Sequence, residues 1–62
     1  SGDDAQLLAR FLQRIVDYYR RDYTIRSVTH LRHAEVFRAE GFVPVREWKH
    51  YLTMEYGKSR QP

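Results

Sequence analysis

The sequence contains no cysteine, only three glycines and two prolines, and no long apolar run. Without cysteine the chain forms neither disulfides nor thiolate metal sites, so its stability must come from packing. No stretch approaches the roughly 18 apolar residues of a membrane-spanning helix, and none has the pattern of a signal peptide. These absences predict a protein of a reducing, intracellular compartment (cytoplasmic or nuclear) that does not enter the membrane.

The chain also has little of what an enzyme needs. Its 62 residues suffice for one domain, and a domain of that size buries only about 60% of the surface that its unfolded chain exposes. A catalytic site normally needs a concave cleft that excludes water. There is no glycine loop for phosphates and no Gly-x-Ser-x-Gly motif. We therefore expect a protein that is not an enzyme and has no cofactor and no small-molecule substrate.

The organisation that we expect is one helical domain over residues 3–57. Residues 1–2 resemble the remnant of an expression tag, and the polar residues 58–62 resemble a linker tail. We interpret the chain as a domain of a larger protein.

Helical periodicity is clearest in the first third of the chain. Apolar residues recur at the spacing of one helix face at Leu8, Phe11, Leu12, Ile15 and Tyr19. Residues 3 and 4 are aspartates, which favour a helix N-terminus. The pattern predicts a helix over about residues 5–22.

Two further helices are predicted after it. Thr24 or Ser27 can cap a helix that runs to about Glu40, with Gly41 as the left-handed residue that ends it. The irregular apolar pattern within this segment also allows two short helices with a bend near His33. Pro44 then favours a short extended connector over residues 42–45, and a third helix follows over about residues 45–56. The predicted fold is an all-α, small three-helix bundle of helix-turn-helix or helix-extension-helix kind.

The core of this bundle is predicted from its apolar positions. We expect it to contain Leu8, Phe11, Leu12, Ile15, Tyr19, Val28, Leu31, Val36, Val43, Trp48 and Leu52, and to have room for Phe37.

Positive charge is concentrated after Tyr23. Before it, four arginines balance four aspartates, whereas from it onward seven Lys or Arg residues face four glutamates, and all three histidines lie there. A basic helical face is the electrostatic pattern of a nucleic-acid binder. The leading hypothesis is a non-catalytic domain that binds DNA or RNA through phosphate contacts from Arg26, His30, Arg32, His33, Arg46 and Lys49. Glutamates interleaved with these residues weaken the pattern of positive charge. A close alternative to nucleic-acid binding is therefore that these charges are merely solvated and that the domain binds a protein partner.

That alternative is a docking or dimerisation domain. Five tyrosines are many for 62 residues, and Tyr and Arg often anchor protein interfaces. The partner-binding residues would then be exposed aromatics, namely Tyr18, Tyr23, Phe37 and Tyr56.

Two spaced pairs also allow a metal hypothesis. His30 and His33 lie three residues apart, as do Glu47 and His50, so each pair would share one face of a helix. Whether the pairs converge stays open at this stage, and our prediction is that no metal is bound.

Short segments resemble nucleic-acid-associated folds. Residues 31–35 followed by residues 41–44 are similar to the helix–wing passage of winged-helix regulators of the mercury-resistance type. Residues 31–33 with 40–45 resemble the amino-terminal lobe of RNA 2′-phosphotransferases, and the order of elements over 27–54 resembles helix-extension-helix DNA-binding modules. The spacing differs in the first two, and the third lacks the second glycine of its pattern, so no family is assigned.

Overall fold

The computed structural model describes residues 2–57, so the predicted tag residue Ser1 and the tail 58–62 lie outside the described residues. In chain order, the elements are α1 (Gly2–Tyr19), β1 (Ile25–His30), the short 3-10 helix η1 (Leu31–His33), α2 (Ala34–Ala39), β2 (Val43–Trp48) and β3 (Tyr51–Tyr56). Two α-helices and a three-stranded antiparallel sheet make an α+β fold. The predicted all-α three-helix bundle is therefore wrong.

The first predicted helix is confirmed as α1. It begins at Gly2, carries Asp3 and Asp4 in its first turn, and ends at Tyr19. The amide of Tyr23 donates to the carbonyl of Tyr19 at 3.0 Å, which closes the turn after the helix. A continuous apolar stripe without glycine or proline explains why this element was recognisable.

The second predicted helix is half wrong. Its first part is strand β1, which pairs along its whole length with β3 from Ile25↔Tyr56 to His30↔Tyr51. Only its last part is helical, as η1 and α2. The predicted stop is confirmed, because Gly41 has a φ of 96° and its amide donates to the carbonyl of Arg38 at 3.0 Å.

The third predicted helix is wrong, because the extended connector continues as a β-hairpin. β2 and β3 are joined by the two-residue turn Lys49–His50, with Trp48 opposite Tyr51 at its mouth. Lys49 adopts a left-handed conformation with a φ of 55°. The register shifts between Pro44 and Arg46, where proline cannot donate to the ladder.

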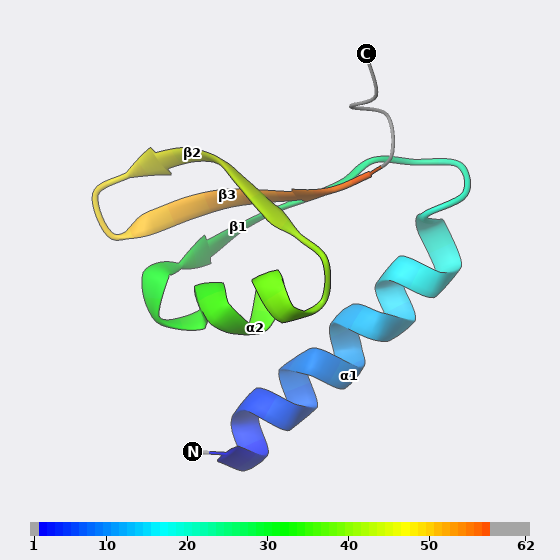
Figure 1. The fold of residues 1–62 in the computed structure, drawn as a ribbon, viewed down its shortest axis with the longest axis horizontal. Helices are drawn as coiled ribbons and strands as arrows, with labels where there is room; N and C mark the ends of the chain where they lie inside the picture. Colours follow the sequence, from blue (N-terminus) through cyan, green and yellow to red (C-terminus); the bar gives the residue numbers. More distant parts are fainter. Residues whose placement is uncertain (1, 58–62) are drawn as a thin grey trace.

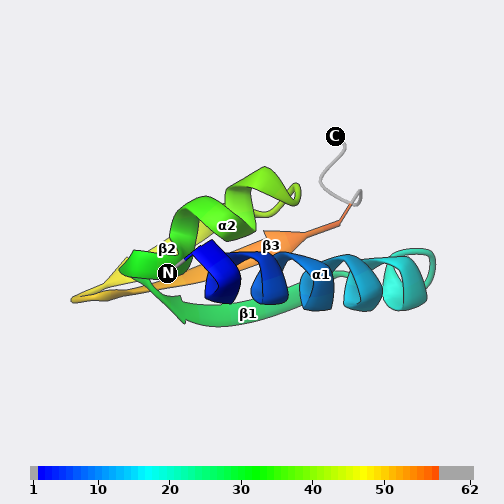
Figure 2. The same cartoon turned by 90° about the horizontal axis from the view of Figure 1, so that it is seen from below.

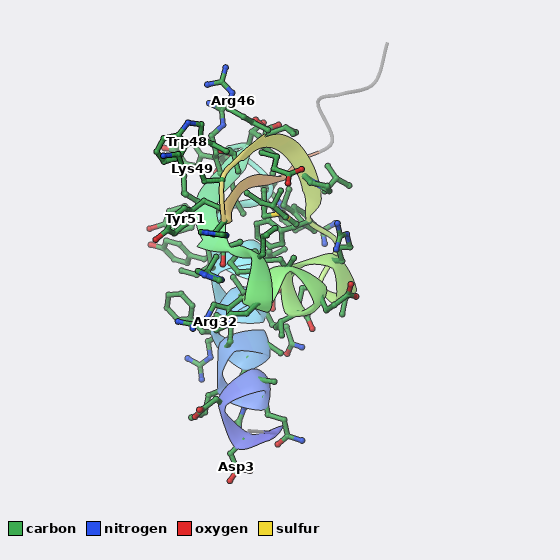
Figure 3. All side chains as sticks on the ribbon, turned by 90° about the vertical axis from the view of Figure 1, so that its left-hand side faces the viewer. Asp3, Arg32, Arg46, Trp48, Lys49 and Tyr51 are labelled. Atoms are coloured by element: carbon green, nitrogen blue, oxygen red, sulfur yellow. The ribbon has the colours of Figure 1, made fainter. Side chains whose placement is uncertain are left out.

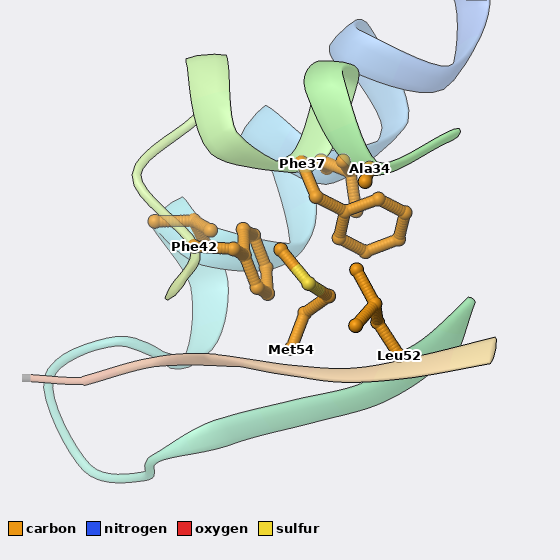
Figure 4. Packing of buried hydrophobic residues seen from close by; sticks show 7 residues of the cluster. Ala34, Phe37, Phe42, Leu52 and Met54 are labelled. Atoms are coloured by element: carbon orange, nitrogen blue, oxygen red, sulfur yellow. The ribbon is translucent and has the colours of Figure 1, made fainter. Parts of the chain in front are cut away.

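Both helices cover the same face of the sheet, whose strand order is β1-β3-β2 (Figures 1 and 2). Between the layers lies a small core that includes Phe37 of α2, Phe42 after it, and Leu52 and Met54 of β3 (Figure 4). Phe42 and Met54 are the largest fully buried side chains. The molecule measures 36 × 27 × 13 Å along its principal axes, so it is thin and leaves one sheet face uncovered.

The predicted core is confirmed only in part. Leu12, Leu52 and Phe37 are buried, and Leu8 and Val36 pack against them. The positions predicted to be buried but found exposed are Phe11, Tyr19, Val28, Leu31, Val43 and Trp48. The core residues missed are Val16, Ala34, Phe42 and Met54. The errors at Val28, Trp48 and Met54 follow from the wrong secondary structure, since a strand and a helix turn different residues inward. Those at Phe11, Val16 and Tyr19 lie in the helix that was predicted correctly, where the buried face was assigned to the wrong side.

Candidate functional site

The sheet face opposite the helices is the strongest candidate surface. Successive strand residues point to opposite faces, and Leu52 and Met54 point to the helices. The strand register therefore places on the other side Arg26, Val28 and His30 of β1, Arg46 and Trp48 of β2, and Tyr51, Thr53 and Glu55 of β3. We call this set the open face.

Two aromatic residues flank the mouth of the hairpin on the open face. Trp48 and Tyr51 are directly opposite in the hairpin register, and they are 63% and 44% exposed. The ammonium of Lys49 lies 4.9 Å from the centre of the Trp48 ring, which is cation–π distance. Figure 3 looks onto this hairpin end, where Arg46, Trp48, Lys49 and Tyr51 follow one another along one side of the molecule.

A shallow hollow lies beside the aromatic pair. Its volume is about 380 Å³, and its lining includes Val28, Arg46, Trp48, Tyr51 and Thr53 from all three strands. A hollow with apolar walls and one arginine at its side suits a flat apolar group that carries negative charge at its edge.

Arg26 is the one open-face arginine that already has an anionic partner. Its Nε donates to Oε2 of Glu55 at 2.9 Å, and Nη2 donates to the same oxygen. The Glu55 side chain is only 11% exposed, whereas that of Arg26 is 68% exposed. This pair is a structural cross-strand contact, so Arg26 offers less free charge to a ligand than Arg46 does.

Histidines gather where β1 ends beside the hairpin turn. The rings of His30 and His50 are stacked with centroids 6.2 Å apart, and His30 meets Tyr51 edge-on at 5.6 Å. Nδ1 of His30 accepts the amide of Arg32 at 3.1 Å. Partial desolvation, and then the positive charges of Arg32, His50 and His33, lower the pKa of His30 below its usual value.

Arg32 and His33 belong to a different surface. With Asp4 of α1 and Val36 of α2 they line a hollow of about 630 Å³ on the helical side of the sheet. The six predicted nucleic-acid contacts are thus divided between two places. Arg26, His30, Arg46 and Lys49 lie at the open face or its hairpin end, and Arg32 and His33 lie on η1.

The four aromatic residues of the docking hypothesis are also divided. Tyr18 and Tyr23 are 75% and 63% exposed. Phe37 is buried in the core, and Tyr56 is half-buried against Phe42 with ring centroids 5.5 Å apart. The prediction that Phe37 and Tyr56 are exposed is wrong, because both face the contact between the sheet and α2.

Sequence reasoning missed Trp48 and Tyr51 as site residues. Trp48 was assigned to the core because it is large and apolar, and Tyr51 was assigned to a helix. One signal was present in the sequence: Leu52, Met54 and Tyr56 alternate with Tyr51, Thr53 and Glu55, which is the pattern of a strand with two different faces.

The metal hypothesis can be compared with the geometry directly. His30 and His50 come together, but Glu47 pairs with Leu52 in the register and so belongs to the helix-covered side. Within residues 2–57 there is no group of three or more His, Asp or Glu side chains placed to hold a metal ion. Over the same described residues, no helix combines the length and apolar character required to cross a bilayer.

Comparisons of the chain with protein-family models, with curated proteins and with solved structures found no match. Function is therefore inferred from the geometry of the open face.

Proposed function

We propose that the open face binds single-stranded nucleic acid without catalysis. The observation that carries this proposal is the exposed pair of Trp48 and Tyr51 in the hairpin, with the cations of Arg46 and Lys49 beside it. Bases of any sequence stack on aromatic side chains, and cations along the same path hold the phosphates.

The shape of the molecule favours a single strand over a duplex. A protein normally reads duplex DNA by inserting a helix or a free two-stranded β-ribbon into the major groove. The β2–β3 hairpin is not a free ribbon, because β3 also pairs with β1. α2 has only six residues, and it directs Ala34 and Phe37 into the core. The open face, in contrast, is a sheet with aromatic rings on its surface, which suits splayed bases. The intracellular compartment expected from the sequence is part of this proposal.

The test is fluorescence anisotropy of labelled single-stranded DNA, single-stranded RNA and duplex DNA at low and moderate salt. Stacking contributes about 1–3 kcal/mol per base, so Trp48→Ala should weaken single-strand binding roughly 5- to 150-fold. Arg46→Ala should also lower the slope of log K against log salt by about 0.7, the value for one phosphate contact on a single strand.

Arg14→Ala is the matched control for Arg46→Ala. It removes the same charge from the exposed surface of α1, far from the open face in sequence and on the other layer. We expect it to leave the affinity within about twofold of the wild-type value, because a distant exposed charge is largely screened. The proposal would be contradicted if Arg14→Ala and Arg46→Ala lowered the affinity for single strands equally, or if the wild-type protein bound no single strand at low salt.

A docking function is the second candidate, and one observation favours it. Leu7, Phe11 and Tyr18 of α1 are 64%, 59% and 75% exposed. Their spacing places them on one helix face, and exposed apolar residues grouped in this way are typical of protein contacts. A protein partner bound to this face would be insensitive to Trp48→Ala and Arg46→Ala, which separates the two candidates.

A further inference from the structure

Three surfaces outside the aromatic pair are candidates for a further role. The apolar face of α1 has nothing in the structure that indicates what covers it. The hollow between α1 and η1 contains Asp4 beside Arg32 and His33, so its charges are already mixed. The third is the hairpin end of the open face, where His30 and His50 stack and Lys49 precedes His50 in the turn. Only this third surface combines converging groups of one charge type with a neighbouring binding face.

We propose that the imidazoles of His30 and His50, together with the ammonium of Lys49, hold a phosphodiester of the bound strand, and that affinity for single strands therefore rises as the pH falls. This inference rests on the proposed function, because it assigns the phosphate next to the base stacked on Trp48 and Tyr51.

The geometry supports a shared anion. His50 and Lys49 are exposed residues of the turn, and the half-buried ring of His30 lies parallel to that of His50 within 15°. Nδ1 of His30 accepts the amide of Arg32, so the neutral ring carries its proton on Nε2, which can donate to a ligand. Charging the ring adds a proton to Nδ1 and breaks the bond from the Arg32 amide, which also disfavours protonation of His30 in the free protein. Lys49 connects the two parts of the surface, because its ammonium lies over the Trp48 ring.

The charges around His30 explain the expected pH dependence. The groups that act on it are Arg32 and His33 of η1, His50 of the turn and the ring of Tyr51 on β3. Two carboxylates belong to neighbouring segments: Asp4 lines the hollow with Arg32 and His33, and Glu47 lies by register on the helix-covered side. The cationic neighbours disfavour protonation of His30 in the free protein.

A bound phosphodiester reverses this balance. Its negative charge stabilises the imidazolium form, so the pKa of His30 is higher in the complex than in the free protein, where it is lowered. Binding then takes up protons, and by linkage the affinity increases as the pH falls through the region near the usual histidine pKa of about 6.5. A phosphodiester stays ionised throughout this range, so only the protein titrates.

The experiment measures the affinity for an oligothymidylate without terminal phosphates, between about pH 8 and about pH 5.5 at fixed ionic strength. We expect the wild-type protein to bind about tenfold more tightly at the lower pH. The affinity of the double variant His30→Asn/His50→Asn should change less than about twofold over the same pH range. Asparagine suits this test because its side-chain oxygen can accept the amide of Arg32 as Nδ1 does.

His33→Asn is the matched control, since it removes the third histidine, on the helical side, and should keep most of the pH dependence. A second readout, the NMR titration of the ring protons in the wild-type protein, should show a higher pKa for His30 with oligothymidylate than without it. Inorganic phosphate at the same phosphate concentration should raise the pKa of His30 much less, because it lacks a base to stack.

The outcomes separate this inference from the proposed function. Binding that depends on Trp48 but not on pH overturns the phosphate site and leaves the open face as the binding surface. Full pH dependence in the double variant also overturns it, as does an equal effect of inorganic phosphate. The absence of binding at every pH overturns both proposals.

Discussion

Gly41 shows how one residue fixes the turn between α2 and β2. Its φ of 96° lies where residues with a side chain are strained, and a Cβ atom would come within 2.7 Å of Cε2 of Tyr56. Tyr56 in turn packs on the fully buried Phe42. The glycine is therefore required both by the backbone and by the core beside it.

We predict that Gly41→Ala lowers the free energy of unfolding by about 1–3 kcal/mol. This is a large share of the roughly 3–9 kcal/mol that a domain of 62 residues has in total. Chemical denaturation is the measurement. Gly2→Ala serves as the control, because a Cβ atom there meets nothing within 4 Å. Similar stabilities for the two variants would show that the turn differs from the one described.

The ion pair between Arg26 and Glu55 joins two side chains of very different exposure. The arginine is exposed, but the carboxylate that it neutralises is nearly buried. Removing the arginine leaves that carboxylate without this partner in a partly desolvated place, which is more costly than losing a surface ion pair.

Arg26→Ala should lower the unfolding free energy by about 1–3 kcal/mol. Arg38→Ala removes the exposed pair with Glu35, whose atoms lie 3.3 Å apart, and should cost no more than about 0.5 kcal/mol. Thermal or chemical unfolding of both variants provides the comparison, and a smaller loss for Arg26→Ala than for Arg38→Ala would contradict the assigned contact. Binding tests should accordingly use Arg46 rather than Arg26.

The helices and strands differ in how well they could be predicted from the sequence. α1 could be predicted because its apolar stripe, its acidic first turn and the lack of glycine and proline after Gly2 all agree. β1 could not, because its inward residues are Ile25, Ser27 and Thr29 while the apolar Val28 points outward and is 67% exposed. The usual alternation of apolar and polar residues is therefore absent from this strand, so its sequence is equally compatible with a helix.

The hairpin was partly predictable. Alternation in β3 is regular, with Leu52 and Met54 buried and Tyr51 exposed. The turn, however, consists of Lys49 and His50, with no glycine or asparagine at the left-handed position that Lys49 occupies, although such residues are the strongest hairpin signal. Without a visible turn, one continuous helix over residues 45–56 was the simpler interpretation.

The concentration of positive charge could be read from the sequence, but the positions of these charges in the fold could not. The prediction placed six cationic or titratable residues on a helical face. The sheet instead places Arg26 and His30 on one edge strand and Arg46 on the other, with β3 and its Tyr51 between them. The strand order β1-β3-β2 makes neighbours of Arg26 and Glu55, which are 29 positions apart in the sequence, and no local pattern specifies that order.

The thin shape of the molecule connects the fold to the proposed function. Two layers bury one sheet face and leave the other uncovered, so Val28, Trp48 and Tyr51 are exposed although they lie in strands. An exposed face of this kind is either a binding surface for bases or a contact surface for protein. The cations beside Trp48 favour the first for the open face, and the apolar face of α1 is a separate candidate surface for a protein partner.

Chemical-shift mapping by NMR can show directly whether the open face is the nucleic-acid-binding surface. Unlabelled oligothymidylate is titrated into the isotope-labelled protein at low salt, and the amide signals and the indole N–H signal of Trp48 are followed. The account predicts that the signals of Trp48, Tyr51, Arg46 and Lys49 shift together and saturate, while those of Leu7 and Phe11 on α1 stay in place. Shifts confined to α1, or no shifts at any oligonucleotide concentration, would contradict the open face as the nucleic-acid-binding surface.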